Sequence, residues 1–229
     1  MLALFAALAS MLAAQSFNGE AEMTVEQSYL QESVELTIIR EQSRSNSREA
    51  KMTALEYITA AINRGSKSDE IRASLEYLAL EGVVNIAREN GRVTNNFPDI
   101  RKQAAAALGN LGTPEAKATL LKMIGADNDP QVIAEALKSL CLIGNNDDNE
   151  ISLIARTVSR FHNLNPDNMV VLSALDIFEK TAAANNGIRD RFVIETITLV
   201  SESRYYVSTV RNRAKLLLDD LRKYRLTQG

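Results

Sequence analysis

The chain has 229 residues, of which 45% are hydrophobic and 24% are charged, and these proportions are those of an ordinary globular protein. The formal net charge of −3 excludes a general electrostatic attraction to nucleic acids, so no nucleic-acid partner is expected. Because the whole chain holds one cysteine and one histidine, a disulfide framework and a metal cluster built from histidines and cysteines are also excluded.

Residues 1–14 form an apolar, uncharged run that ends in small residues, which is typical of a secretory signal peptide. We expect cleavage after Ala14 and export. The basic residues that usually open such a signal are missing, so either the signal is atypical or the true start lies upstream. The run is shorter than the roughly 20 apolar residues that span a bilayer, and no transmembrane segment is expected in the mature chain. A short membrane anchor or a buried N-terminal helix would be the alternatives.

Residues 15–46 read as a polar lead-in followed by a helix that caps the rest of the chain. Thr24 opens a capping-box spacing, and apolar residues then recur at intervals of four from Leu30. A helix is therefore predicted from about 25 to 42. Its amphipathic pattern suits the N-terminal cap of a repeat array, in which terminal units need a polar outer face.

The centre of the chain repeats itself at a fixed spacing. Pro98, Pro114 and Pro130 stand sixteen residues apart, and Gly112 is followed by Gly144 thirty-two residues later. This is the period of a helix pair, and it indicates repeats that stack to complete one shared core. The residues between are helical in pattern rather than alternating.

Helix boundaries follow from the prolines and glycines. Proline is favoured at the first helical position, so helices are predicted to begin at all four prolines, Pro166 included. The expected N-caps are Thr113, Asp129 and Asn165, and the glycines expected to close helices are Gly112, Gly125 and Gly144. From Ser47 onward, helices are predicted at roughly 48–63, 68–90, 98–110, 114–124, 130–143, 149–162, 166–184, 187–203 and 207–225.

The wording of residues 100–112, Ile-Arg-x-x-Ala-Ala-x-Ala-Leu-Gly-x-Leu-Gly, is followed by Thr-Pro-Glu-Ala and a leucine-rich run. This phrase resembles the HEAT repeat in its short bacterial form, the PBS-lyase-like repeat. The match returns over residues 130–144, where Ile133 stands in the place of Arg101. The resemblance implies an all-α fold, an α-solenoid of stacked antiparallel helix pairs (a HEAT-type superhelix) over residues 47–225, with residues 226–229 as a tail.

A search for chemical motifs predicts no catalytic, cofactor-binding or metal-binding residues. His162 is expected at a helix end on the surface, and Cys141 lies in an apolar run and is expected in the core. The acidic clusters at 127–129 and 146–150 lack the twelve-residue pattern of a calcium loop, and we interpret them as solvated helix caps. No cofactor is expected.

Charge is unevenly distributed along the chain. Residues 19–39 hold five glutamates and no basic residue, whereas residues 204–225 hold seven basic and two acidic residues. These charges suit exposed terminal helices with pairs at helical spacing. They would also suit a basic docking end for an acidic partner, or head-to-tail contact between copies of the chain.

Two groups of residues are candidates for protein binding. One group points outward from the second helices of the predicted pairs, and in HEAT solenoids such helices usually line the concave side. It comprises Lys117, Lys122, Arg156 and Arg160. The other lies near the C-terminus and comprises Arg204, Tyr205, Tyr206 and Arg211, because tyrosine and arginine are enriched at binding hot spots. Both groups also suit ordinary structural roles, and the two tyrosines equally suit packing of the last repeat.

These features together predict a non-enzymatic scaffold for protein–protein interaction, exported and part of a periplasmic assembly in the cell envelope. If residues 1–14 are retained, an intracellular HEAT-repeat adaptor is the better interpretation. The family label also suggests a lyase-like chaperone for a cofactor. The sequence does not identify the protein partner.

Overall fold

The computed structural model of the chain describes residues 25–226. The predicted signal peptide, most of the lead-in and residues 227–229 lie outside the described residues. The chain forms two compact units, Met1–Glu35 and Leu36–Gly229. Of the first unit only the beginning of helix α2 is described, and the account below concerns the second unit.

Ten α-helices and one β-hairpin make up the described residues. The helices are α2 (Val25–Arg44), α3 (Arg48–Asn63), α4 (Asp69–Leu80), α5 (Pro98–Leu111), α6 (Pro114–Ala126), α7 (Pro130–Ile143), α8 (Asp148–Leu164), α9 (Asn168–Ala184), α10 (Arg191–Glu202) and α11 (Ser208–Leu226). The strands are β1 (Arg88–Glu89) and β2 (Arg92–Val93). The predicted all-α solenoid is confirmed.

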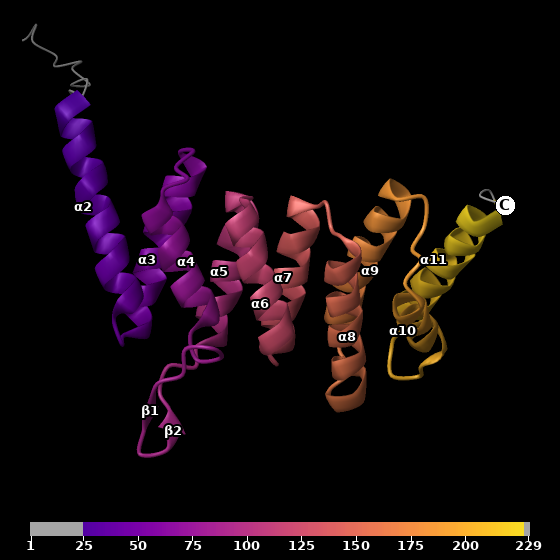
Figure 1. The fold of residues 1–229 in the computed structure, drawn as a ribbon. Coiled ribbons are helices and arrows are strands. Elements are labelled where there is room, and N and C mark those ends of the chain that lie inside the picture. The colour runs from indigo at the N-terminus through magenta and orange to yellow at the C-terminus, as the bar shows by residue number, and fades with distance from the viewer. Residues whose placement is uncertain (1–24, 227–229) are drawn as a thin grey trace, which may run out of the picture. The chain divides into compact units, whose positions relative to one another are not determined.

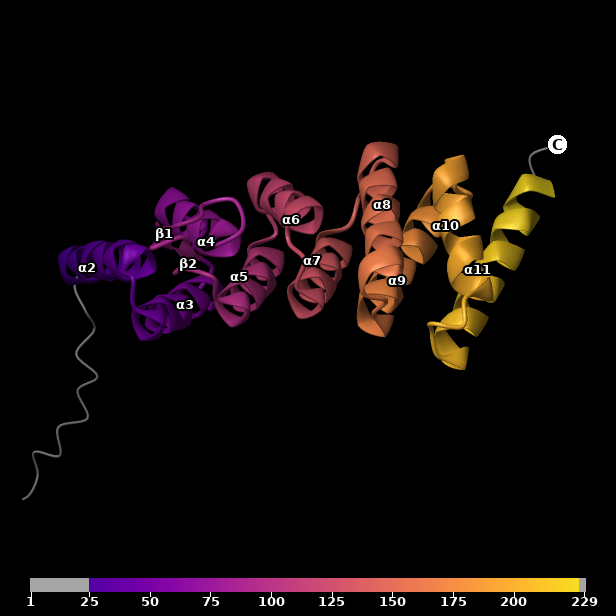
Figure 2. The same cartoon turned by 90° about the horizontal axis from the view of Figure 1, so that it is seen from below.

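The helices of the second unit lie in two rows. The odd-numbered helices from α3 to α11 pack side by side in one row, and the even-numbered helices from α4 to α10 form the other (Figures 1 and 2). From α3 to α11 the chain crosses from one row to the other at every connection. Each helix therefore completes the core of its neighbours, as expected for stacked repeats.

One continuous apolar core lies between the rows. Its pattern is clearest in α5, where Ile100, Ala104, Leu108 and Leu111 fall on one face and are all buried. Helices α5 and α7 approach closely beside this face. A Cβ atom added to Gly109 would lie 2.7 Å from the Cβ of Ser139, so only glycine fits there without a shift of α7.

The N-caps in the centre of the chain are as predicted. The side chain of Thr113 accepts a hydrogen bond from the Ala116 N–H, and Asp129 accepts from the N–H groups of Gln131 and Val132. Each precedes a proline at the first helical position, where the missing N–H leaves no unpaired donor. The capping residues and prolines of the repeat therefore start α6 and α7 where the sequence predicted.

Two boundary predictions are wrong. Asp167, not Asn165, is the N-cap of α9, because its carboxylate accepts hydrogen bonds from two N–H groups of the first turn, so Pro166 precedes the helix. Asn165 is instead the C-cap of α8. Gly125 lies within α6, which continues to Ala126.

The largest correction concerns the helix predicted over 68–90. It ends at Leu80, and an insertion of residues 81–97, which carries the β-hairpin, leads to α5. Gly82, Asn90 and Gly91 all have positive φ, which a right-handed helix does not accept. Asn90-Gly91 is a two-residue hairpin turn of a common kind.

Candidate functional site

A buried ion pair lies at the N-terminal end of the stack. Lys51 is the fourth residue of α3, and its Nζ lies 2.8 Å from Oε2 of Glu81, the residue that follows α4. Both side chains are at most 5% exposed. Nζ also donates to the Ser43 carbonyl at 3.1 Å and lies 5.3 Å from the centre of the Tyr77 ring. The ammonium group is therefore fully engaged within the protein, as a buried charge must be.

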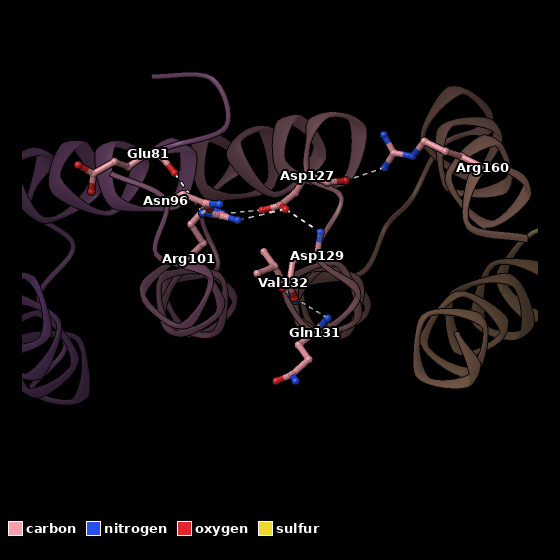
Figure 3. A network of polar contacts seen from close by, with 8 residues as sticks. All are labelled: Glu81, Asn96, Arg101, Asp127, Asp129, Gln131, Val132 and Arg160. Atoms are coloured by element: carbon pink, nitrogen blue, oxygen red, sulfur yellow. Dashed lines mark hydrogen bonds and ion pairs between the residues drawn. The ribbon is translucent and has the colours of Figure 1, made fainter. Parts of the chain in front are cut away.

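The same arrangement returns one repeat later. Arg101 is the fourth residue of α5, and it contacts Asp127 after α6 through Nε–Oδ2 at 2.6 Å and Nη2–Oδ1 at 3.3 Å (Figure 3). Its remaining nitrogen, Nη1, donates to Asn96 Oδ1 at 2.8 Å and to the Glu81 carbonyl at 3.4 Å. One guanidinium thus joins the end of α4, the end of α6 and the insertion between α4 and α5.

Asp127 has further partners that fix the next helix. Its Oδ1 accepts the N–H of Asp129, the residue that caps α7, at 2.9 Å, and its carbonyl accepts Arg160 Nη2 at 2.9 Å (Figure 3). The prediction of solvated caps is wrong for Asp127, which is buried. Its carboxylate is committed to a guanidinium and a backbone N–H.

The ion-pair pattern stops at α7. Ile133 and Val171 occupy the fourth position of α7 and α9 and are buried among apolar side chains. Arg160 of α8 instead binds the end of α6 from the neighbouring helix, donating to the carbonyls of Ile124 at 3.1 Å and Gly125 at 2.9 Å. Burial lowers the pKa of Arg160, against a smaller opposing effect of Asp127.

The basic residues predicted on the second helices are mostly engaged within the fold. The Nζ atom of Lys117 lies 2.7 Å from Oε2 of Glu150, and that of Lys122 lies 2.7 Å from Oε1 of Glu76. Arg160 binds backbone carbonyls as described above. Arg156 is exposed on α8. The structure therefore brings these four residues onto one row of helices, with three of them already paired inside the protein.

The two tyrosines near the C-terminus have opposite environments. Tyr206 is 1% exposed, and its hydroxyl lies 3.2 Å from Nδ1 of His162. Arg211 donates through Nη1 to the Tyr206 carbonyl. Tyr206 is therefore a core residue, as the alternative of packing the last repeat predicted, and not a surface contact. Arg211 holds the loop through the Tyr206 carbonyl. His162, predicted on the surface, is half-buried against this loop.

Tyr205, in contrast, is 69% exposed, and Arg204 beside it is exposed as well. The centre of the Tyr205 ring lies 5.5 Å from that of His162, and the Val207 N–H donates to Asn168 Oδ1 at 3.0 Å. These contacts place the loop before α11 against the turn between α8 and α9.

That turn also exposes large apolar side chains. Leu164 and Met169 are more than half exposed, as is Val207 in the neighbouring loop. We call Leu164, Met169, Tyr205 and Val207 the tyrosine edge. Sequence reasoning found only Tyr205 among them; the available signal for the other three was an apolar residue at a helix end, outside the buried stripe.

A groove of about 690 Å³ crosses the row of odd-numbered helices. The exposed side chain of Leu142 lies at the surface of this groove. The arginine that lines the groove is already paired, because Arg213 Nη2 lies 2.5 Å from both Asp176 Oδ1 and Glu179 Oε2. Within residues 25–226, no group of three or more histidine, cysteine, aspartate or glutamate side chains could hold a metal ion. Of the helices described there, none combines the length and apolar character needed to cross a membrane.

Comparisons with known proteins identify the repeat. Residues 90–151 match the family model of HEAT repeats, and no curated protein sequence matches the chain significantly. A solved structure, a de novo designed 16-helix transmembrane nanopore, aligns with 16% identity over 86% of this chain and 62% of its own, with a TM-score of 0.27. This chain thus spans less than two thirds of the nanopore chain, and so low a score carries no argument.

The matched segment contains the Arg101–Asp127 pair and all three prolines of the sixteen-residue spacing, Pro98, Pro114 and Pro130. HEAT repeats generally mediate protein–protein interactions and are typically non-catalytic scaffolds. Residues 90–151 of the chain therefore contain HEAT repeats, and the two rows of helices with their shared core form an all-α HEAT-type solenoid.

Proposed function

We propose that this protein is a non-enzymatic scaffold that binds a protein partner through the tyrosine edge. The observation that carries the proposal is that large apolar side chains are exposed on both sides of the Val207–Asn168 hydrogen bond: Leu164 and Met169 at the facing ends of α8 and α9, and Tyr205 and Val207 in the loop before α11. Several exposed apolar side chains on neighbouring segments mark interaction sites more often than solitary ones do. Arg204 adds a cationic group beside them.

The loop that presents Tyr205 is held firmly from below. Tyr206 is anchored in the core by His162, Arg211 binds its carbonyl, and Val207 is bound to Asn168. A loop fixed before binding loses less conformational entropy when a partner docks. An exposed tyrosine beside an arginine on such a support suits the centre of a binding hot spot.

We also propose export of the chain to a periplasmic assembly of the cell envelope. The support is the apolar run of residues 1–14 with its small residues before Gln15. An intracellular adaptor remains the alternative proposal. The mature N-terminus separates the two: a chain that begins near Gln15 supports export, whereas an intact Met1 in a cytoplasmic complex supports the adaptor.

The test is crosslinking and co-purification of the natively expressed chain, with Tyr205→Ala compared against wild type. Truncation of a hot-spot tyrosine costs about 2 kcal/mol or more, so partner capture should weaken on the order of 30-fold. Tyr57→Ala is the matched control, because Tyr57 is an exposed tyrosine on α3. Equal capture by wild type and Tyr205→Ala would overturn the proposed binding edge, and a stoichiometric small molecule in place of a protein would favour the cofactor chaperone.

A further inference from the structure

The insertion between α4 and α5 departs from the regular repeat. It spans residues 81–97, whereas the connections on either side of α6 consist of residues 112–113 and 127–129. The β-hairpin within it projects beyond the ends of α4 and α5 (Figure 1). It contributes nothing to the shared core, since the hairpin side chains from Val84 to Thr94 are exposed.

From this geometry we infer that the hairpin is a second contact site, at which an extended acidic segment of a partner protein pairs with strand β1. This inference rests on the proposed scaffold function and names a class of partner for it. It concerns a surface separate from the tyrosine edge.

The base of the hairpin is fixed to the repeat. The Asn95 side chain donates to the Asn85 carbonyl at 2.8 Å and accepts the Ala87 N–H at 2.9 Å, and the Gly82 N–H donates to the Asn85 carbonyl at 2.9 Å. The residues at the two ends of the insertion, Glu81 and Asn96, both bind Arg101. The base of the hairpin is thus held in place by hydrogen bonds to Arg101, which belongs to the buried ion pair with Asp127.

Among the residues that the structure describes, only β2 pairs with strand β1, and the outer edge of β1 is unpaired. The register pairs Arg88 with Val93 and Glu89 with Arg92, and the Thr94 N–H donates to the Ala87 carbonyl. Because backbone groups alternate in direction along an antiparallel strand, those of Ile86 and Arg88 point away from β2. Such a row of free N–H and C=O groups is a template for an added strand.

The side chains indicate what the added strand would contain. Ile86, Arg88 and Val93 share one face of the hairpin by alternation, and all three are exposed. Within the described residues neither Arg88 nor Arg92 forms an ion pair, although Glu89 lies opposite Arg92 in the register; Arg88 donates to the nearby Gly91 carbonyl at 3.3 Å. An added strand would lie beside β1 with every second residue on the face of Ile86 and Arg88, where a carboxylate would pair with the Arg88 guanidinium. The residues between would lie beside Glu89 and are therefore expected to be uncharged.

A lipid bilayer suits this surface less well. Exposed valine and isoleucine beside arginine could approach a membrane, but free strand edges are not tolerated in hydrocarbon because their N–H and C=O groups would be left unpaired. An extended protein segment satisfies those groups and the side chains together.

The experiment measures the binding of a fluorescein-labelled peptide, in which glutamate alternates with valine and threonine, to the full chain by fluorescence anisotropy. Three variants are compared with wild type: Ile86→Pro, which removes one outward N–H, the double variant Arg88→Glu with Arg92→Glu, and Tyr205→Ala. We expect both hairpin variants to weaken binding at least about tenfold, and Tyr205→Ala to leave it unchanged. Replacing every glutamate of the peptide by lysine should abolish binding.

Several results would overturn the inference. The inference is wrong if the peptide does not bind, or if it binds the hairpin variants as tightly as wild type. In either case, Tyr205-dependent capture of the native partner would still support the proposed scaffold function. Flotation of the chain with vesicles of zwitterionic and anionic lipid, lost in the Arg88→Glu and Arg92→Glu variant, would assign the hairpin to a membrane surface. Hairpin-dependent dimerisation in sedimentation would make a second copy the occupant. Equal melting temperatures of the double charge variant and wild type exclude misfolding as the cause of lost binding.

Discussion

Removal of the Asp127 carboxylate tests whether the buried ion pair organises the central repeats. In the Asp127→Ala variant, Arg101 loses two charge-assisted hydrogen bonds, at 2.6 and 3.3 Å, and the Asp129 N–H loses its acceptor. The Arg101 side chain is 3% exposed, so its charge cannot be rehydrated without opening the structure. Its remaining partners are Asn96 and the Glu81 carbonyl, and both are neutral acceptors.

Breaking a buried ion pair by removing one partner typically costs about 3–5 kcal/mol, because the other charge stays buried and uncompensated. With a urea m-value of about 3 kcal/mol/M, the upper end of the range for small proteins, the unfolding midpoint should fall by roughly 1–1.7 M. Urea titration followed by far-UV circular dichroism measures this shift. In the double variant Asp127→Ala with Arg101→Met the buried charge is gone, so the midpoint should recover towards that of wild type.

The matched control is Asp219→Ala, which removes the partner of Arg222 in an exposed pair at 2.9 Å on α11. Exposed pairs contribute about 0–1 kcal/mol, so its midpoint should hardly move. The reasoning is refuted if Asp127→Ala costs less than about 1 kcal/mol, or if the Arg101→Met change adds its own full cost in the double variant instead of offsetting the first.

Two further predictions concern the core and the C-terminal loop. Leu108→Asp should unfold at least its own helix pair, because Leu108 is fully buried and a carboxylate there has no partner; an unchanged thermal melting curve would contradict the assignment of the inward face. Burial, followed by the charge of Asp167, raises the pKa of Tyr206 to about 12. Since the folded pKa lies above the ordinary value of 10.0, its contribution to stability is complete below pH 10 and is lost as the pH rises towards 12. Tyr206→Phe should therefore reduce the fall in unfolding free energy across that interval, and urea titrations at several pH values would show an unaltered slope if the reasoning fails.

The regular part of the fold was predictable because it depends on local backbone chemistry. Pro114 and Pro130 are at the first helical position, Thr113 and Asp129 cap their helices, and Gly112 adopts the left-handed conformation that ends α5. Each of these effects acts within a few residues of its cause. Local chemistry also explains the error at Asn165. Asn165 and Asp167 flank Pro166 and are both good capping residues, so the sequence alone does not decide which of them caps α9.

The ion pairs and the hairpin were not predicted, for different reasons. Lys51 and Glu81, like Arg101 and Asp127, are far apart in sequence and meet only because successive helix pairs stack. A charged residue on a helical stripe is usually solvated, so its burial cannot be inferred from spacing alone. The hairpin did leave a local signal in Asn90-Gly91, but apolar residues before it resembled a continuation of α4.

The candidate sites show the same division. The exposure of Tyr205 and the burial of Tyr206 follow from which of two neighbouring residues enters the core beside His162. Composition predicts that a tyrosine beside an arginine is a good contact residue, but it cannot assign that role to one of two consecutive tyrosines. Tertiary packing makes the choice, and it selects the residue next to Arg204.

The supports of the two proposed contact sites do not share a residue. The hairpin depends on Arg101, Asn95 and Asn96, whereas the tyrosine edge depends on His162, Arg211 and Asn168. Each site should therefore be weakened without affecting the other, and a partner that reaches both would gain from the effective concentration of the second contact once the first has formed. On this reasoning Asp127→Ala should impair binding of the acidic peptide, because it loosens Arg101 under the hairpin, while Tyr205-dependent capture persists under conditions in which the variant is folded.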